Sequence, residues 1–308
     1  YLLGLTATPE RMDGRSVYEL YDFEVPYEIT LKEAVNRGVL VPFHYYGIMD
    51  DTVDYSALHF VRGHYEESEL TAAYLENAKR DQLILRYFLK YHPKHALGFC
   101  CSSQHASHMA RFFLERGIAS GGVYSREDNT ENEGDEKTYW LDRIEAVKKL
   151  ESGEIQALFC VDMFNEGVDI PVVDLVMFLR PTESPIIFLQ QLGRGLRLYD
   201  GKECLTVLDF IGQANKNYNF ETKFRALVGK SRKSIQHYLE NGFSNLPRGS
   251  YIQLEKLAQS YVLRNLKQTS INKRSLTEKV KYFEEDTGLP LQLDYFLDIN
   301  GLTLFEFY

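Results

Sequence analysis

Two arginines three residues apart offer the clearest chemistry in this sequence. Arg194 and Arg197 lie in the stretch FLQQLGRGLRLYDG, beside Gly193 and Gly195. On a helix, residues three apart share one face, and planar guanidinium groups bind phosphate oxygens in a forked manner. The glycines leave room for a polyanion or a second domain to approach closely. The pattern predicts a phosphate-binding pair, while a surface pair that balances acidic neighbours fits these residues equally well.

A glycine and a carboxylate form a second candidate site in the stretch NEGVDIPVVDLV. Gly167 and Asp169 lie in a predicted turn between two strands, just before Pro171. Proteins of the α/β class bind ligands at the carboxyl ends of their strands. There a carboxylate can accept from ribose hydroxyls, and a glycine lets backbone N–H groups reach phosphate. The pattern predicts a nucleotide site, and the alternative is an ordinary turn before a proline.

Short apolar strands alternate with helices from about residue 66 to residue 212. Such runs of about four to eight apolar residues, separated by helices, predict a parallel sheet covered on both faces. One helix is expected over 67–92, ending before Pro93, and a later helix, SPIIFLQQLGRGLRL, carries both arginines. After Gly212 the pattern predicts helices and no further strand.

The composition is that of a globular protein of 308 residues. No apolar run approaches the ~18–20 residues that a membrane span needs, so no membrane partner is expected. Cys100, Cys101, Cys160 and Cys204 lie in apolar runs without a C-x-x-C pair. They are expected to be buried, reduced thiols, which is typical of a cytoplasmic protein, and no metal site is expected.

The net charge of −9 is unevenly distributed. Residues 215–267 hold ten Lys and Arg against three Asp and Glu, a local charge of +7. Lys223, Arg225, Lys230, Arg232 and Lys233 gather in the stretch KFRALVGKSRKS. This stretch predicts a phosphate-tracking patch, and a solvated helix face is the alternative.

Four motifs then occur in a fixed order: LGLTATPERMDG, GFCCSSQHAS, CVDMFNEGVDIP and FLQQLGRGLR. Together they resemble motifs III to VI of superfamily 2 helicases of the DEAD/DEAH type, in particular the DNA-directed type I/III restriction and excision-repair branch. The resemblance covers residues 1–212. It implies an α/β fold, with a RecA-like parallel sheet that carries helices on both faces and a smaller, mostly helical domain after it. The implied division is 1–39 for the end of a first RecA-like domain and a linker, 40–212 for the second RecA-like domain, and 213–308 for the helical domain.

The resemblance also implies roles for single residues. Arg194 and Arg197 match the arginine fingers that reach the γ-phosphate across a domain interface and stabilise the transition state of phosphoryl transfer. Gln190 begins the same motif. Gly167 and Asp169 match positions near the ribose of the nucleotide.

Other residues match positions that couple hydrolysis to nucleic acid. Thr6, Ala7 and Thr8 match the triplet that links hydrolysis to strand movement. For Ser102 an ordinary helix cap is the alternative to a nucleic-acid contact. The residues expected to contact nucleic acid, from the motifs and from the basic stretch, are Ser102, Asp162, Asn165, Lys230, Arg232 and Lys233.

Two motifs that an ATPase needs are absent from the sequence. It contains no G-x-x-x-x-G-K-[ST] loop to hold a triphosphate and no D-E-x-D or D-E-x-H box to hold magnesium. The family places both in its first RecA-like domain, before motif III. We therefore expect ATP and Mg²⁺ to be cofactors of a longer protein, with that N-terminal domain as a partner, and this chain alone to be inactive in hydrolysis.

The leading hypothesis is the C-terminal part of an ATP-dependent DNA helicase or translocase. Gln190 and Gln191 stand where RNA-directed relatives usually carry His-Arg, which favours DNA, duplex or single-stranded, over RNA. The alternatives are a non-catalytic nucleic-acid-binding module of the same fold and an unrelated nucleotide enzyme complete in itself. The arginine pair argues against the first and the missing phosphate loop against the second. Strand separation, polarity and a fused nuclease are left open.

Overall fold

The computed structural model describes most of the chain, with gaps. The described residues are 21–22, 24–61, 64–124, 139–161, 170–182, 184–212, 218, 220–229, 231–269, 273–287 and 289–300. Eight of the residues singled out above lie outside them: Thr6, Ala7, Thr8, Asp162, Asn165, Gly167, Asp169 and Lys230.

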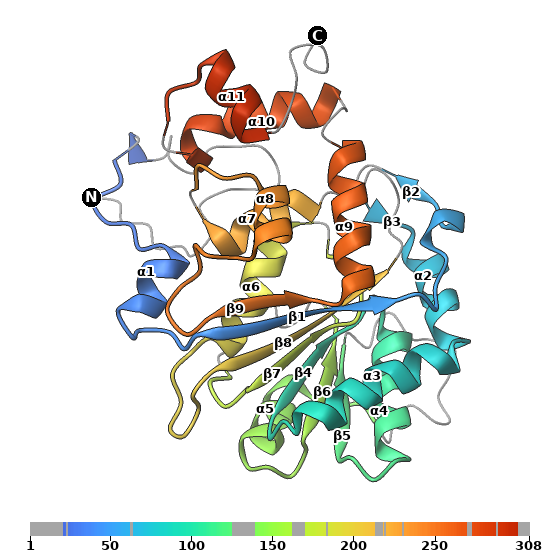
Figure 1. Cartoon of the computed structure of the whole chain (residues 1–308). Helices are drawn as coiled ribbons and strands as arrows, with labels where there is room; N and C mark the ends of the chain where they lie inside the picture. Colours follow the sequence, from blue (N-terminus) through green and yellow to red (C-terminus); the bar gives the residue numbers. More distant parts are fainter. Residues whose placement is uncertain are drawn as a thin grey trace.

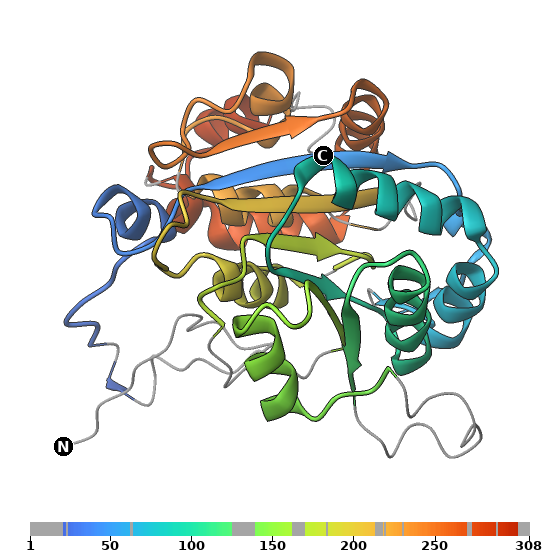
Figure 2. The ribbon, with the colours of Figure 1, turned by 90° about the horizontal axis from the view of Figure 1, so that it is seen from below.

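A seven-stranded sheet forms the centre of the described structure, and its neighbouring strands pair in parallel. Its order is β5-β6-β4-β7-β8-β1-β9, and Figure 2 shows β9, β1, β8, β7 and β4 in that succession. A short antiparallel pair, β2 with β3, lies apart from it. The strands are β1 (Phe43–Asp50), β2 (Phe60–Val61), β3 (His64–Tyr65), β4 (Ala96–Phe99), β5 (Ser120–Val123), β6 (Ala157–Cys160), β7 (Leu175–Phe178), β8 (Leu205–Gly212) and β9 (Tyr251–Leu254).

Helices cover both faces of this sheet (Figure 1). Helices α3 and α4 pack on one face, and α5 to α9 contribute to the hydrophobic cluster of the other. The helices are α1 (Leu31–Asn36), the 3₁₀ turn η2 (Tyr55–Ala57), α2 (Glu67–Leu75), α3 (Ala78–Tyr91), α4 (Ser103–Leu114), α5 (Arg143–Glu151), α6 (Pro185–Gly195), α7 (Phe220–Val228), α8 (Ile235–Asn241), α9 (Lys256–Thr269), α10 (Lys273–Thr287) and α11 (Leu293–Asn300).

The strands are buried on both faces because successive side chains alternate between two hydrophobic clusters. Val176 and Phe178 of β7 point to the cluster under α6, whereas Leu175 and Met177 point to the cluster under α3 and α4. This period of two is what a parallel sheet requires. The predicted RecA-like fold, a parallel sheet with helices on both faces, is therefore confirmed.

The expectation that no strand follows residue 212 is wrong. Strand β9 pairs in parallel with β1, with His44 opposite Tyr251 and Gly47 opposite Leu254, and forms one edge of the sheet. Helices α7, α8 and α9 share the hydrophobic cluster of this sheet, while Phe283, Phe296 and Ile299 of α10 and α11 form a small cluster of their own. The division at residue 213 stays a prediction.

The single helix expected over 67–92 is in fact two helices. The first, α2, ends at Leu75, and Asn77 caps the start of α3 because its side chain accepts from the backbone N–H of Arg80 at 3.1 Å. The Asn77 amide also donates to the main-chain oxygen of Thr52 at 2.9 Å. An asparagine with both partners available favours a cap over a continuous helix.

Candidate functional site

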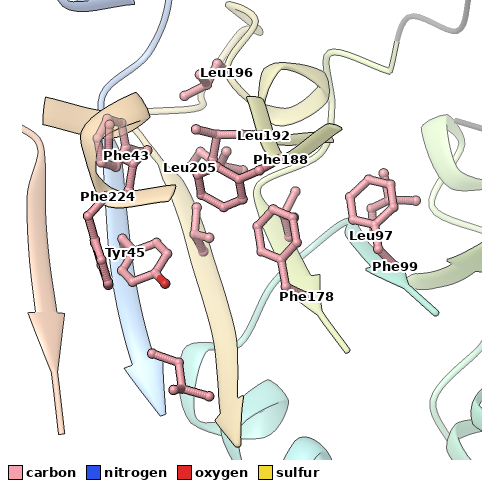
Figure 3. Packing of buried hydrophobic residues seen from close by; sticks show 14 of the residues in the cluster. Phe43, Tyr45, Leu97, Phe99, Phe178, Phe188, Leu192, Leu196, Leu205 and Phe224 are labelled. Carbon is pink, nitrogen blue, oxygen red and sulfur yellow. The ribbon is translucent and has the colours of Figure 1, made fainter. Parts of the chain in front are cut away.

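Helix α6 carries the arginine motif and packs firmly on the sheet. The Ser184 side chain accepts from the Ile187 N–H at 3.3 Å, and Pro185 stands at the start of the helix, where its missing N–H costs nothing. Phe188 and Leu192 are fully buried against the strands, and Figure 3 shows them facing Phe178 of β7. The Phe178 and Phe188 ring centroids are 4.9 Å apart. The helix therefore holds Arg194 on a rigid support.

The two arginines do not share one helix face, contrary to the sequence-based expectation. The helix ends at Gly195, so Arg194 lies in its last turn and Arg197 lies beyond it. Arg197 forms an antiparallel bridge with Leu40, and the Val41 N–H donates to the Leu196 oxygen at 2.8 Å. The Arg197 side chain is exposed, whereas Arg194 is half-buried. The segment before β1 thus fixes the backbone of the exposed arginine.

The two glycines beside the arginines serve different purposes. A Cβ atom on Gly193 would meet nothing within 4 Å, so this position leaves the space that the sequence suggested. A Cβ atom on Gly195 would collide with the side chain of Leu205 at the start of β8. The expectation that Gly195 provides access for a ligand is therefore wrong, because the glycine instead lets α6 approach the sheet.

Gln190, which begins the same motif, is half-buried on α6, and the next residue, Gln191, is 1% exposed. The structure brings Gln190, Arg194 and Arg197 into one region. Its relation to Gly167 and Asp169 stays a prediction, since both glycine and aspartate lie outside the described residues.

Lys202 belongs to the same region and is missed by sequence reasoning. Its ammonium group donates to the main-chain oxygens of Pro171 at 2.6 Å, Gly195 at 3.0 Å and Val173 at 3.1 Å. In the sequence, Lys202 directly follows the arginine stretch, which ends at Gly201, and this position is the feature that could have indicated its role.

Ser102 is the N-cap of α4, on the opposite face of the sheet. Its hydroxyl oxygen accepts from the His105 N–H at 3.2 Å and from the Thr71 hydroxyl at 2.8 Å, and the residue is 5% exposed. This geometry gives Ser102 a structural role as a cap. Its contact with nucleic acid stays a prediction.

A buried polar cluster at the carboxyl ends of β1, β4 and β7 was also missed. The Arg80 guanidinium is 1% exposed, donates to Asp50 at 2.8 Å and to the Leu179 oxygen at 2.6 Å, and lies 3.8 Å from the Tyr74 ring centroid. His105 lies 3.5 Å from the same guanidinium. Burial, reinforced by the Arg80 charge, holds the pKa of His105 well below its usual range. The cluster thus joins the ends of these strands to the helices α2, α3 and α4.

The predicted basic patch is smaller than its sequence suggests. Lys223 is 3% exposed and forms a buried ion pair with Asp209 of β8, which also accepts from the Tyr45 hydroxyl. The prediction that Lys223 belongs to a solvent-facing patch is therefore wrong. Arg232 and Lys233 are exposed, as the patch requires.

The cysteines, possible metal ligands and helix lengths of the described residues bear on other classes of site. Cys100, Cys101 and Cys160 are buried free thiols, and Cys204 is half-buried. In the described part of the chain, no three His, Cys, Asp or Glu side chains gather so that they could hold a metal ion. Within the same residues, no helix combines the length and apolar content that crossing a membrane requires.

The parallel sheet and the arginine-bearing helix packed on one of its faces define the class of protein, a RecA-like α/β domain. Residues 79–199 match the family described as "Helicase conserved C-terminal domain". Over these residues the chain is similar to the C-terminal domain of helicases, and the resemblance seen in the sequence is confirmed to that extent.

Two known proteins have similar sequences over about two thirds of the chain. The chain is 28% identical over 207 residues to the 51.5 kDa protein of a Lactococcus phage (isolate 7-9), covering 67% of this chain and 42% of the relative. It is 26% identical over 219 residues to the Saccharomyces cerevisiae protein designated ATP-dependent helicase IRC3. This match covers 70% of this chain and 30% of the yeast protein. The chain thus spans less than half the length of these relatives.

One solved structure has a similar fold over most of the chain. It is a fragment assigned to the HsdR subunit of a type I restriction enzyme from Vibrio vulnificus YJ016, with a TM-score of 0.50 and 20% identity. The similarity covers 81% of this chain and 43% of that one. At this identity the comparison supports the fold alone.

Proposed function

We propose that this chain is the second half of an ATP-dependent DNA helicase or translocase. It supplies Arg197 and Arg194 as arginine fingers to an ATP site whose phosphate-binding loop lies in another domain. The carrying observation is the exposed Arg197 side chain, whose backbone is fixed by the bridge to Leu40. An exposed arginine on a rigid support suits the charge that develops on a transferring phosphoryl group.

The surroundings of Arg197 suit contact with a second domain. Val39, Leu198 and Tyr199 are neighbours of the bridge in sequence, and 55%, 55% and 47% of their surfaces are exposed. Large apolar side chains exposed beside a fixed charge are typical of an interface. An N-terminal RecA-like domain, with Thr6, Ala7 and Thr8 as its coupling triplet, is the partner that we propose.

The chemistry of the site fits a nucleotide phosphate. When bound, ATP with Mg²⁺ supplies the phosphoryl group and the metal that neutralises its charge. This chain supplies Arg197 and Arg194 to orient the phosphate, with Gln190 beside them and Gly167 and Asp169 proposed near the ribose. The triphosphate itself must be held elsewhere, because the sequence has no phosphate-binding loop.

We propose DNA, rather than RNA, as the nucleic acid. Among the relatives is the yeast ATP-dependent DNA helicase MPH1, 36% identical over 92 residues, 28% of this chain and 9% of MPH1. Contacts are proposed from Ser102, Asp162 and Asn165 and from Lys230, Arg232 and Lys233. A cytoplasmic location is proposed with this function, because the cysteines are free thiols.

The test is ATP hydrolysis by the intact protein, with its phosphate-loop domain, beside this chain alone. We expect hydrolysis by the intact protein, stimulation by DNA more than by RNA, and none by this chain. An intact protein that hydrolyses no ATP with either nucleic acid would overturn the proposal and favour a non-catalytic binding module. Stimulation by RNA alone would overturn the choice of DNA.

A further inference from the structure

Lys202 makes a three-way contact between segments that are distant in sequence. It follows a turn in which its own N–H donates to the Tyr199 oxygen at 3.0 Å and Gly201 adopts a φ of 74°. The turn directs the half-buried side chain back toward the end of α6. A residue with a Cβ atom would be strained at this positive φ, so the turn depends on glycine at position 201.

Three acceptors of the Lys202 ammonium group are main-chain oxygens. The Gly195 oxygen lies at the C-terminus of α6, where carbonyl groups lack partners within the helix and carry partial negative charge. The oxygens of Pro171 and Val173 lie in the turn that leads into β7, closed by the Val173 N–H donating to Ile170 at 3.2 Å. An ammonium group has three donors, which matches the three oxygens.

We propose that Lys202 is a positioning residue that holds the arginine-bearing end of α6 against the segment that follows the ribose-binding motif. This inference rests on the proposed function. Gly195 directly follows Arg194 and lies two positions before Arg197. Pro171 lies two positions after Asp169. One ammonium group therefore fixes the spacing between the two parts of the nucleotide site that this chain supplies.

The geometry predicts a loss of catalytic rate more than a loss of binding. A displacement of about 1 Å in a positioned catalytic group can lower the rate by ~10²-fold. A finger that acts mainly in the transition state leaves ground-state binding little changed. Lys202→Met in the intact protein should therefore lower kcat for DNA-stimulated ATP hydrolysis by about 10-fold to 100-fold and change KM for ATP by less than about threefold.

A double-mutant cycle distinguishes positioning from general stability. The variants are Lys202→Met, Arg197→Ala and the double variant, with Lys148→Met on α5 as a control that removes an exposed lysine. If Lys202 acts through the arginine, Lys202→Met adds less than about threefold in the Arg197→Ala background. The control should match the wild type. Lys202→Gln, which keeps an amide donor, replaces Lys202→Met if that variant does not fold.

Each outcome decides one question. An equal loss of kcat from the Lys202 substitution in both backgrounds would overturn the positioning role, as would an unchanged kcat alongside a strong Arg197→Ala effect. Normal turnover in Arg197→Ala itself would instead overturn the proposed arginine finger. The two failures are thereby distinguishable.

Discussion

The side chain of Leu205 occupies the space that a Cβ atom on Gly195 would need. An added Cβ would lie less than 3.0 Å from two carbon atoms of Leu205, at the start of β8. Gly195→Ala should therefore destabilise the chain by about 1–3 kcal/mol, since overpacking forces the helix or the leucine to shift. Chemical denaturation of the chain measures this difference.

Gly193 gives the matched control for this prediction. It lies in the same helix with nothing within 4 Å of its added Cβ, so Gly193→Ala should stabilise the chain by up to about 1 kcal/mol through helix propensity. Equal effects at the two positions would contradict the packing role of Gly195.

The buried ion pair of Lys223 and Asp209 should matter strongly for stability. Both side chains are less than 5% exposed, and Lys223 also lies 5.0 Å from the Phe188 ring centroid of α6. Lys223→Met alone leaves a buried carboxylate without its cation and should cost about 3–5 kcal/mol of unfolding free energy. Adding Asp209→Asn should recover part of this loss. Exposed Lys148→Met is the control and should stay within about 0.5 kcal/mol of the wild type; a Lys223→Met variant equally close would refute the prediction.

The buried imidazole of His105 should make the chain sensitive to mild acid. Its pKa in the folded chain is well below the ordinary value of 6.5 because of burial and the nearby Arg80 charge. Below pH 6.5 the unfolded chain binds a proton that the folded chain does not, so stability falls as the pH falls. The slope from one such group approaches ~1.4 kcal/mol per pH unit.

Denaturation at pH values between about 5 and 7 measures this slope. His105→Gln should reduce it by roughly the contribution of one proton, because glutamine does not titrate. Identical slopes for His105→Gln and the wild type would show that the buried imidazole is not its source.

The two arginines should respond differently to substitution in the intact protein. Arg197→Ala should lower ATP turnover by about 10³-fold or more, the usual contribution of an arginine finger, and leave stability within about 0.5 kcal/mol because the side chain is exposed. Arg194→Ala should lower both turnover and stability, because the Arg194 Nε is buried. Steady-state hydrolysis and denaturation of the same samples separate these effects, and normal turnover in Arg197→Ala would refute the finger assignment.

The sequence pattern predicted the sheet well because burial on both faces leaves a readable signal. Strands such as Leu175–Phe178 are wholly apolar and lie between helices, so their type follows from composition. Strand β9 was missed because Tyr251–Leu254 is a half-exposed edge strand in which one residue, Gln253, is polar and none is buried. Because α9 begins at Lys256, directly behind this short strand, the strand was read as the start of a helix.

The site was less predictable because its decisive contacts join distant segments. The arginine motif could be read from spacing, but the close packing of Gly195 depends on Leu205, and the burial of Lys223 depends on Asp209. Lys202 donates to backbone oxygens, whose positions no pattern of side chains reveals. Long-range packing therefore decided what local sequence could not.

DNA binding by this chain should weaken steeply with salt if the basic residues contact phosphate. Arg232 and Lys233 are exposed and follow α7, whereas Lys223 is neutralised by Asp209, so we expect fewer phosphate contacts than the basic stretch suggests. Each contact contributes about 0.9 to the slope of log K against log salt on duplex DNA.

Replacing Arg232 and Lys233 together by Ala should therefore lower that slope by roughly 2 and weaken binding without regard to DNA sequence. Fluorescence anisotropy with a labelled duplex at several salt concentrations measures both quantities. Lys148→Ala, which removes an exposed charge on α5, should leave the slope unchanged. A slope equal to the wild-type value in the double variant would show that DNA follows another surface of the chain.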